Sequence, residues 1–108
     1  MIDLELVKSH CRIDSDFTSD DQLLKVYTEA AVSYVQSWTR RQLYPSADSP
    51  GYSDDPDGML LNDAIKAAIL LCISQWYSNR EGVVVGETVS EMPIAVQALL
   101  QPYRIYGL

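Results

Sequence analysis

The sequence has 108 residues, of which 47% are hydrophobic and 21% are charged. A chain of this length and apolar content builds one domain with one core, so we expect a single domain over residues 1–108 and exclude a disordered protein. The net charge is −7, from 15 acidic and 8 basic residues. Nucleic-acid binding needs clustered Lys and Arg to displace counterions, so this balance argues against a tight DNA- or RNA-binding protein.

The first predicted helix covers about residues 4–11, with Asp3 placed to cap it, because Leu4, Val7 and Cys11 recur at helical spacing. Residues 12–18 break this pattern. We expect the two large apolar residues of this loop to pack into the core, namely Ile13 and Phe17.

The second predicted helix begins at Ser19, where Ser19 and Gln22 fit a capping box. It runs to about residue 39 or 41, which is roughly 30 Å at 1.5 Å per residue. The doublet Arg40-Arg41 then places positive charge at the helix C-terminus, where the dipole favours it. One predicted apolar face follows the helix, made of Leu23, Tyr27, Ala30, Ala31, Tyr34, Val35 and Trp38.

The third predicted helix begins near Asn62, a good N-cap, and runs to about Asn79. Leu70 and Leu71 add apolar surface beside its main face, so this helix is expected to be central and the most buried. Its main face consists of Ile65, Ala68, Ile69, Cys72, Ile73 and Trp76. A fourth helix follows, with Pro93 in its first turn and Pro102 at its end.

The expected fold class is therefore all-α, a small bundle of about four helices with one long central helix pair. A flexible acidic loop is predicted over residues 44–61, which several Pro, Gly and Asp residues punctuate. A short strand-like segment is predicted near residues 83–85, between Gly82 and Gly86.

Each candidate metal site in the sequence lacks a ligand that the metal requires. If Gly58 is aligned with the invariant glycine of a calcium loop, Ala64 stands where the bidentate Glu is required. A similar match at Asp14 places Lys25 at that position. Tetrahedral zinc needs four ligands, and the single histidine, His10, has too few partners. We therefore predict no metal and no cofactor.

No catalytic constellation is present either. A nucleophilic pair of His10 and Cys11 is formally possible, but adjacent helical residues point about 100° apart and no third orienting group is evident. The carboxylates stand in loops and at helix starts, and no glycine loop with a Lys could cradle phosphate. We therefore predict that the protein is not an enzyme and has no catalytic residues.

Cysteine content and hydropathy indicate in which cellular compartment the protein is expected. Two cysteines, Cys11 and Cys72, are too few for a disulfide scaffold, which favours free thiols in a reducing cytoplasm. The longest apolar run, Ala67–Ile73, is far shorter than the roughly 20 residues of a membrane helix. The first five residues lack the pattern of a secretory signal. A soluble, intracellular protein without membrane partners is expected.

Two apolar stretches are candidates for contact with another chain. The run Val83, Val84 and Val85 would present side chains to both sides of a strand, of which a monomer easily buries one. The alternative is that this run folds back onto the core. The second stretch is the C-terminal tail, whose apolar side chains mark an interface or, for Tyr103, pack back against the third helix. The tail candidates are Tyr103, Ile105, Tyr106 and Leu108.

Four blocks of the sequence resemble the head–tail connector, or adaptor, proteins of tailed double-stranded DNA phages. The opening block is similar to their N-terminal signature, LELVKSHCRIDSDFTSDDQLL at 4–24. Three further blocks resemble the family's continuation, second half and closing helix, in the same order: AAVSYVQSWTRRQL at 30–43, IKAAILLCISQWYSNREGVVVGE at 65–87 and MPIAVQALLQPYR at 92–104. The resemblance breaks at the 44–61 loop, where longer relatives hold an inserted, strand-rich segment.

The resemblance implies a structural virion protein at the head–tail junction, assembled in the cytoplasm of the bacterial host. Such a subunit forms a homo-oligomeric ring. The number of about a dozen copies is implied by the family resemblance and not by a symmetry argument. Its partners would be the portal protein and tail-side proteins, with genome DNA passing through the channel without specific binding. The candidate apolar stretches would then be subunit, portal or tail interfaces.

A different class of protein remains as the alternative. A small, acidic, helical binding or regulatory module would share the composition and the helical pattern. It would stay monomeric or dimeric at high concentration and would need no portal.

Overall fold

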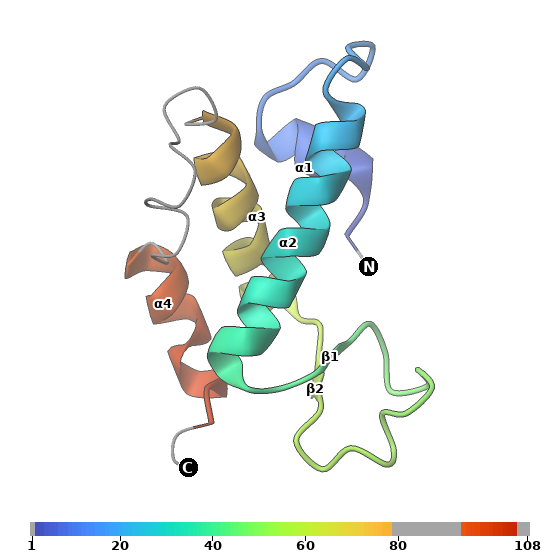
Figure 1. Ribbon diagram of the computed structural model, residues 1–108, viewed down its shortest axis with the longest axis vertical. Helices are drawn as coiled ribbons and strands as arrows, with labels where there is room; N and C mark the ends of the chain where they lie inside the picture. Colours follow the sequence, from blue (N-terminus) through green and yellow to red (C-terminus); the bar gives the residue numbers. More distant parts are fainter. Residues whose placement is uncertain (1, 79–93, 106–108) are drawn as a thin grey trace.

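The computed structural model describes residues 2–78 and 94–105, and these form a small helical bundle (Figure 1). The expected all-α class is confirmed, because helices dominate and the described strands are only two residues long. The elements in chain order are α1 (Leu4–His10), α2 (Asp21–Thr39), β1 (Leu43–Tyr44), β2 (Met59–Leu60), α3 (Asp63–Ser78), α4 (Ile94–Leu100) and the 3₁₀ helix η1 (Gln101–Tyr103). The strand-like segment predicted near residues 83–85 lies outside the described residues.

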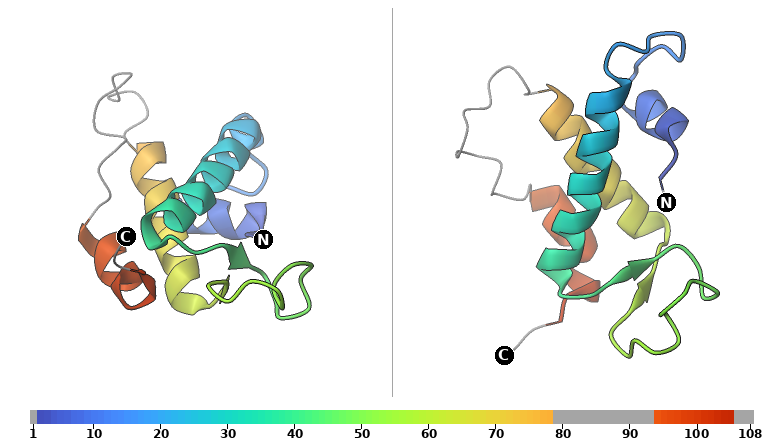
Figure 2. Two further views of the ribbon diagram at one scale, coloured as in Figure 1. Left: turned by 60° about the horizontal axis from the view of Figure 1, so that its bottom comes forward. Right: turned by 45° about the vertical axis from the view of Figure 1, so that its right-hand side comes forward.

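Helix α3 lies at the centre of the bundle, as its sequence predicts. It contacts α1, α2 and α4, and the views in Figure 2 place α2 and α4 on different sides of it. Six of its sixteen residues are buried: Ile65, Ala68, Ile69, Leu70, Cys72 and Ile73. Apolar surface on more than one side of a helix is what packing against several neighbours requires.

Helix α2 buries a slightly different face from the predicted one. Leu24, Ala31 and Val35 are fully buried, whereas Leu23 is half-buried and Ala30 is exposed. Thr39 is also fully buried, and its hydroxyl donates to the carbonyl of Val35 at 2.7 Å. The pattern of large apolar side chains predicted the helix correctly. Some residues of the predicted buried face, however, lie one position before the residues that are buried in the structure.

The predicted capping box of α2 is wrong. The helix begins at Asp21 with Asp20 at the N-cap, and no side chain caps it. Ser19 remains in the preceding turn, and the Asp20 carboxylate instead accepts a 2.6 Å hydrogen bond from the Tyr77 hydroxyl on α3. The Asp20 carboxylate, which could have capped the helix, therefore makes a tertiary hydrogen bond instead.

The starts of α1 and α3 agree with the predicted positions, whereas the predicted end of the third helix at Asn79 and the predicted first turn of the fourth at Pro93 lie outside the described residues. Asp3 is the N-cap residue of α1, although its side chain makes no capping bond. In the loop after α1, Ile13 packs against the core as expected, but Phe17 is 44% exposed, so that prediction is wrong. Phe17 instead contributes its carbonyl, which accepts a hydrogen bond from Lys8.

The predicted acidic loop contains a short parallel strand pair at its ends. Leu43 pairs with Met59 and Tyr44 with Leu60, and both Leu43 and Met59 are buried. The Tyr44 hydroxyl donates to Asp55 at 3.0 Å inside the connection. Gly58 lies so close to the Tyr44 ring that an added Cβ would stand 2.9 Å from it. The flexibility of residues 44–61 stays a prediction.

Arg41 holds three segments together at the other end of α2. Its guanidinium donates to the carbonyls of Asp57 at 2.8 Å, Gly58 at 3.1 Å and Tyr103 at 3.4 Å. The predicted position just beyond the helix is correct, since α2 ends at Thr39 and Arg40 follows in the left-handed conformation. Arg41 is thus a tertiary clamp as well as a positive charge near the helix end.

Asn62 provides the side-chain cap that Ser19 does not. Its Oδ1 accepts from the amide of Ile65 at 3.0 Å, and its Nδ2 donates to the Tyr103 hydroxyl at 3.2 Å. Asn62→Ala should lower the free energy of unfolding by about 1 kcal/mol or more, as lost N-caps do. Asn62→Asp keeps the capping oxygen and should cost less.

Urea denaturation followed by circular dichroism measures both Asn62 variants. Ser19→Ala is the matched control, because its side chain is exposed and outside α2, and it should change stability by less than about 0.5 kcal/mol. A larger loss for Ser19→Ala than for Asn62→Ala would contradict this assignment of the caps.

Candidate assembly surfaces

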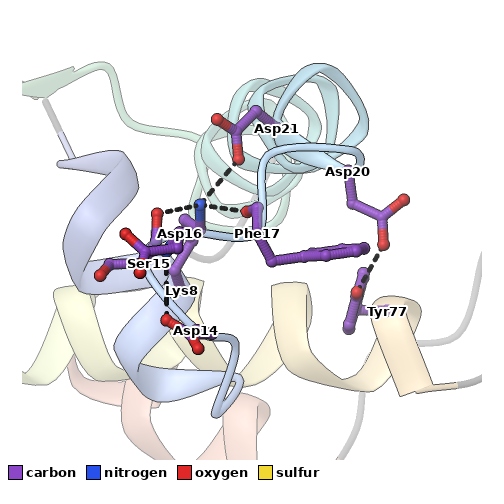
Figure 3. Close-up of polar contacts among 8 residues, drawn as sticks. All are labelled: Lys8, Asp14, Ser15, Asp16, Phe17, Asp20, Asp21 and Tyr77. Carbon is purple, nitrogen blue, oxygen red and sulfur yellow. Dashed lines mark hydrogen bonds and ion pairs between the residues drawn. The ribbon is translucent and has the colours of Figure 1, made fainter.

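Lys8 is buried at the centre of a polar network beneath the turn before α2 (Figure 3). Its side chain is 6% exposed, and its Nζ donates to the carbonyls of Ser15 and Phe17 and to Oδ1 of Asp21, the last at 3.0 Å. All three ammonium hydrogens therefore have acceptors, as a buried charge requires. The network fixes residues 11–20 onto α1 and the start of α2.

A second contact ties the same turn to α3. Asp20 lies beside Tyr77 near the C-terminal end of α3, and Figure 3 shows their hydrogen bond next to the Lys8 network. None of the groups around Lys8 is arranged as a nucleophile with a base, and every Nζ contact is to an oxygen that holds the chain in place. These contacts hold the block over residues 4–24 in place against α3.

Two of the predicted interface residues lie in the described tail. Tyr103 is half-buried, packs against the core and accepts a hydrogen bond from Asn62. Ile105 is also half-buried, and its amide donates to the carbonyl of Thr39 at 3.0 Å. The tail thus returns to the end of α2. The remaining candidates, Val83, Val84, Val85, Tyr106 and Leu108, lie outside the described residues.

Helix α4 exposes an uncharged face that the sequence did not single out. Ile94 is 84% exposed, the most exposed large apolar side chain among those described. Ala95 and Ala98 are exposed on the same short helix, and residues 94–103 contain no charged side chain. Val96 and Leu100 fill the buried side of this helix.

A groove runs along the other side of the molecule, between the N-terminal segment and α2. It has a volume of about 550 Å³, and its apolar lining comes from Ile2, Leu4 and Val32. Lys25 and Glu29 are the charged lining residues, so the lining carries no net charge. Thr28 and Ser33 complete it.

Most acidic residues within 2–78 and 94–105 lie at the two ends of the long axis. Figure 1 shows the turn before α2 at one end and the 45–58 connection at the other. The turn and the first residue of α2 carry Asp14, Asp16, Asp20 and Asp21 against Arg12, and the connection carries Asp48, Asp54, Asp55 and Asp57 with no basic residue. Eight of the twelve acidic residues in the described ranges 2–78 and 94–105 therefore lie at these two ends.

Over 2–78 and 94–105, no three His, Cys, Asp or Glu residues are grouped so as to hold a metal. No helix within those ranges is long and apolar enough to cross a membrane. Both cysteines are free thiols, and burial raises the pKa of Cys72 to about 11 and that of Cys11 above its ordinary value.

Comparisons with known proteins agree with the helical architecture. A family model described as "Phage gp6-like head-tail connector protein" matches residues 1–104. The crystal structure of bacteriophage HK97 gp6 is similar with a TM-score of 0.64 and 22% identity, over 96% of this chain and 93% of that chain. At this identity the structural likeness shows the fold alone. No protein with a curated description matches the sequence.

Lys8→Met keeps most of the apolar stem but removes the ammonium, which leaves the Ser15 and Phe17 carbonyls without this donor. Bonds to charged groups contribute about 1.5–3 kcal/mol each. Because the Asp21 side chain is 28% exposed and can be hydrated, we expect a total loss of about 2–3 kcal/mol. Asp21→Asn, which keeps an acceptor oxygen, should lose about 1 kcal/mol. Equal stability of Lys8→Met and the wild type in urea would contradict the stabilising role of the Lys8 network.

Thiol labelling tests the burial of Cys72. A thiol whose pKa is raised to about 11 has only about one thiolate in a thousand molecules at pH 8, and the thiolate is the nucleophile. A maleimide at pH 8 should therefore modify the half-buried Cys11 before Cys72, which should react only with unfolded protein. Mass spectrometry of the labelled peptides decides this, and equal labelling in the native state would refute it.

Proposed function

The chain belongs to the phage gp6-like head–tail connector family, and on that premise we propose that it is a structural subunit of a ring at the head–tail junction of a virion. The ring joins the portal to the tail, and genome DNA passes through its channel. The single observation that carries the proposal is the family match over residues 1–104, nearly the whole chain. The likeness in fold to HK97 gp6 supports it.

The charge distribution suits a conduit for DNA. A chain of net charge −7 repels phosphate groups, which disfavours tight DNA binding in the channel. The two acidic ends also give the subunit surfaces of strong, like charge that face away from each other along its long axis. Basic surfaces on the portal and on a tail-side protein would complement them and speed association.

Ring closure makes a second demand on the subunit. One face of each copy must meet a different face of the next, since heterologous contacts generate rings when the rotation closes. The hydrophobic candidates for these contacts, or for contacts with portal and tail proteins, are Val83, Val84, Val85, Tyr103, Ile105, Tyr106 and Leu108. Of these, Tyr103 also stabilises the subunit through the hydrogen bond that its hydroxyl accepts from Asn62, so its substitution would change folding as well as assembly. The hydrogen bond of Ile105 is made by its main-chain amide and is kept when the side chain is changed.

Size-exclusion chromatography with light scattering tests the proposal, on the chain alone and mixed with purified portal protein. The proposal predicts a ring-sized species of this chain, alone or bound to the portal. A chain that stays monomeric and never binds the portal at high concentration would contradict it, and would favour a small binding module instead.

Val84→Asp should leave the subunit folded but prevent the ring, because a charge buried in an apolar interface is costly. Val84→Thr is the matched control, since it keeps the β-branched shape without a charge and should assemble. Light scattering measures assembly, and circular dichroism checks the fold. An unchanged oligomer peak for Val84→Asp would refute the role of Val84.

A further inference from the structure

The sides of the subunit differ from its ends in a way that bears on how copies meet. The N-terminal segment and α4 lie on opposite sides of the bundle in Figures 1 and 2, and the groove is lined by that segment and α2. An open groove and a projecting apolar helix face on opposite sides are two different surfaces. A ring built from identical copies requires such a pair.

The α4 face has the composition of a buried contact. Ile94 is 84% exposed, its exposed neighbours Ala95 and Ala98 are small, and residues 94–103 carry no charge. In a chain with 21% charged residues, a helix of this kind is depleted in the groups that interfaces exclude from their centres. The face is also flanked in sequence by both of the proposed apolar stretches, Val83–Val85 and the C-terminal tail.

The groove has the matching composition. Ile2, Leu4 and Val32 provide apolar lining for an aliphatic side chain, and Lys25 and Glu29 cancel in charge. Helix α4 of the same subunit lies on the opposite side of the bundle from the N-terminal segment that lines the groove (Figure 2).

Charge bears on how two copies of this chain can approach each other. Two copies that each carry −7 repel wherever acidic surfaces face each other, and like charges placed together across an interface cost free energy. The α4 face and the groove are both free of net charge, whereas the acidic ends are not. Copies can therefore approach side by side with less repulsion than end to end.

From this complementarity we infer that the groove is the docking site for α4 of a second copy, with Ile94 against the lining that includes Val32. The inference rests on the proposed ring and names its contact: each subunit offers α4 on one side and the groove on the other. The acidic ends then remain free for the proteins above and below the ring.

Cross-linking of paired cysteines tests this contact in the assembled complex with portal protein. Ile94→Cys and Ser33→Cys place one thiol on each proposed surface, and both positions are exposed in the subunit. Cys11→Ala removes the more accessible native thiol, and Cys72 stays as a buried, protonated thiol. A short bismaleimide should then join successive copies into a ladder of multimers on a denaturing gel.

Three controls make the result specific. Each single-cysteine variant should stop at dimers, and Ile94→Cys combined with Ala47→Cys in the exposed 45–58 connection should give no ladder. Intact ring or portal complex without a ladder, or a link only to the portal, would overturn the inference and leave the proposed function standing. No ring and no ladder would overturn both.

Discussion

The burial of α3 is the constraint on which the rest of the structure depends. This helix carries charge only in its first turn, at Asp63 and Lys66, and the remaining residues of its sequence are largely apolar. Burying them removes enough apolar surface from water to stabilise a domain of this size. To cover α3, the chain places α1 and α2 against one part of its surface and α4 against another. The two outer sides of the subunit follow from that arrangement.

Hydrogen bonds from Lys8 and Arg41 add to the stability that the apolar core provides. The segments between helices are also fixed by side chains that donate to main-chain carbonyls: Lys8 at one end of the bundle and Arg41 at the other. Each cation satisfies carbonyls that have no partner in a helix or a sheet, which matters because such groups are costly to leave unpaired when buried. The clamps thereby hold the acidic turn and the acidic connection at fixed ends of the bundle.

The sequence was sufficient where the signal is local or repeated. The apolar residues of α3 predicted a central helix, and Asn62 predicted its cap, because both depend on neighbours within one or two turns. The sequence did not predict contacts that depend on a residue far away in the chain. Asp20 turns to Tyr77 instead of capping α2, and Leu43 pairs with Met59 across a long connection that carries turn residues only. Lys8 could have been found, because it lies on the same predicted face as Leu4, Val7 and Cys11.

The assembly surfaces were the hardest part to predict. Helical spacing identifies the side of α4 that faces its own core, and an exposed Ile94 becomes informative only when the fold shows that nothing in the described chain covers it. The groove depends on how Ile2 and Leu4 approach α2, which no local pattern contains. The family likeness supplies the reason to expect a ring, and the fold supplies the two sides from which one can be built.

Cryo-electron microscopy of this chain bound to purified portal protein tests the central claim most directly. The account predicts a closed ring of copies on the portal, with α4 of each subunit against the N-terminal segment and α2 of the next and with the acidic ends directed along the channel axis. Particles that show portal alone, or a ring in which copies meet through their acidic ends, would contradict it.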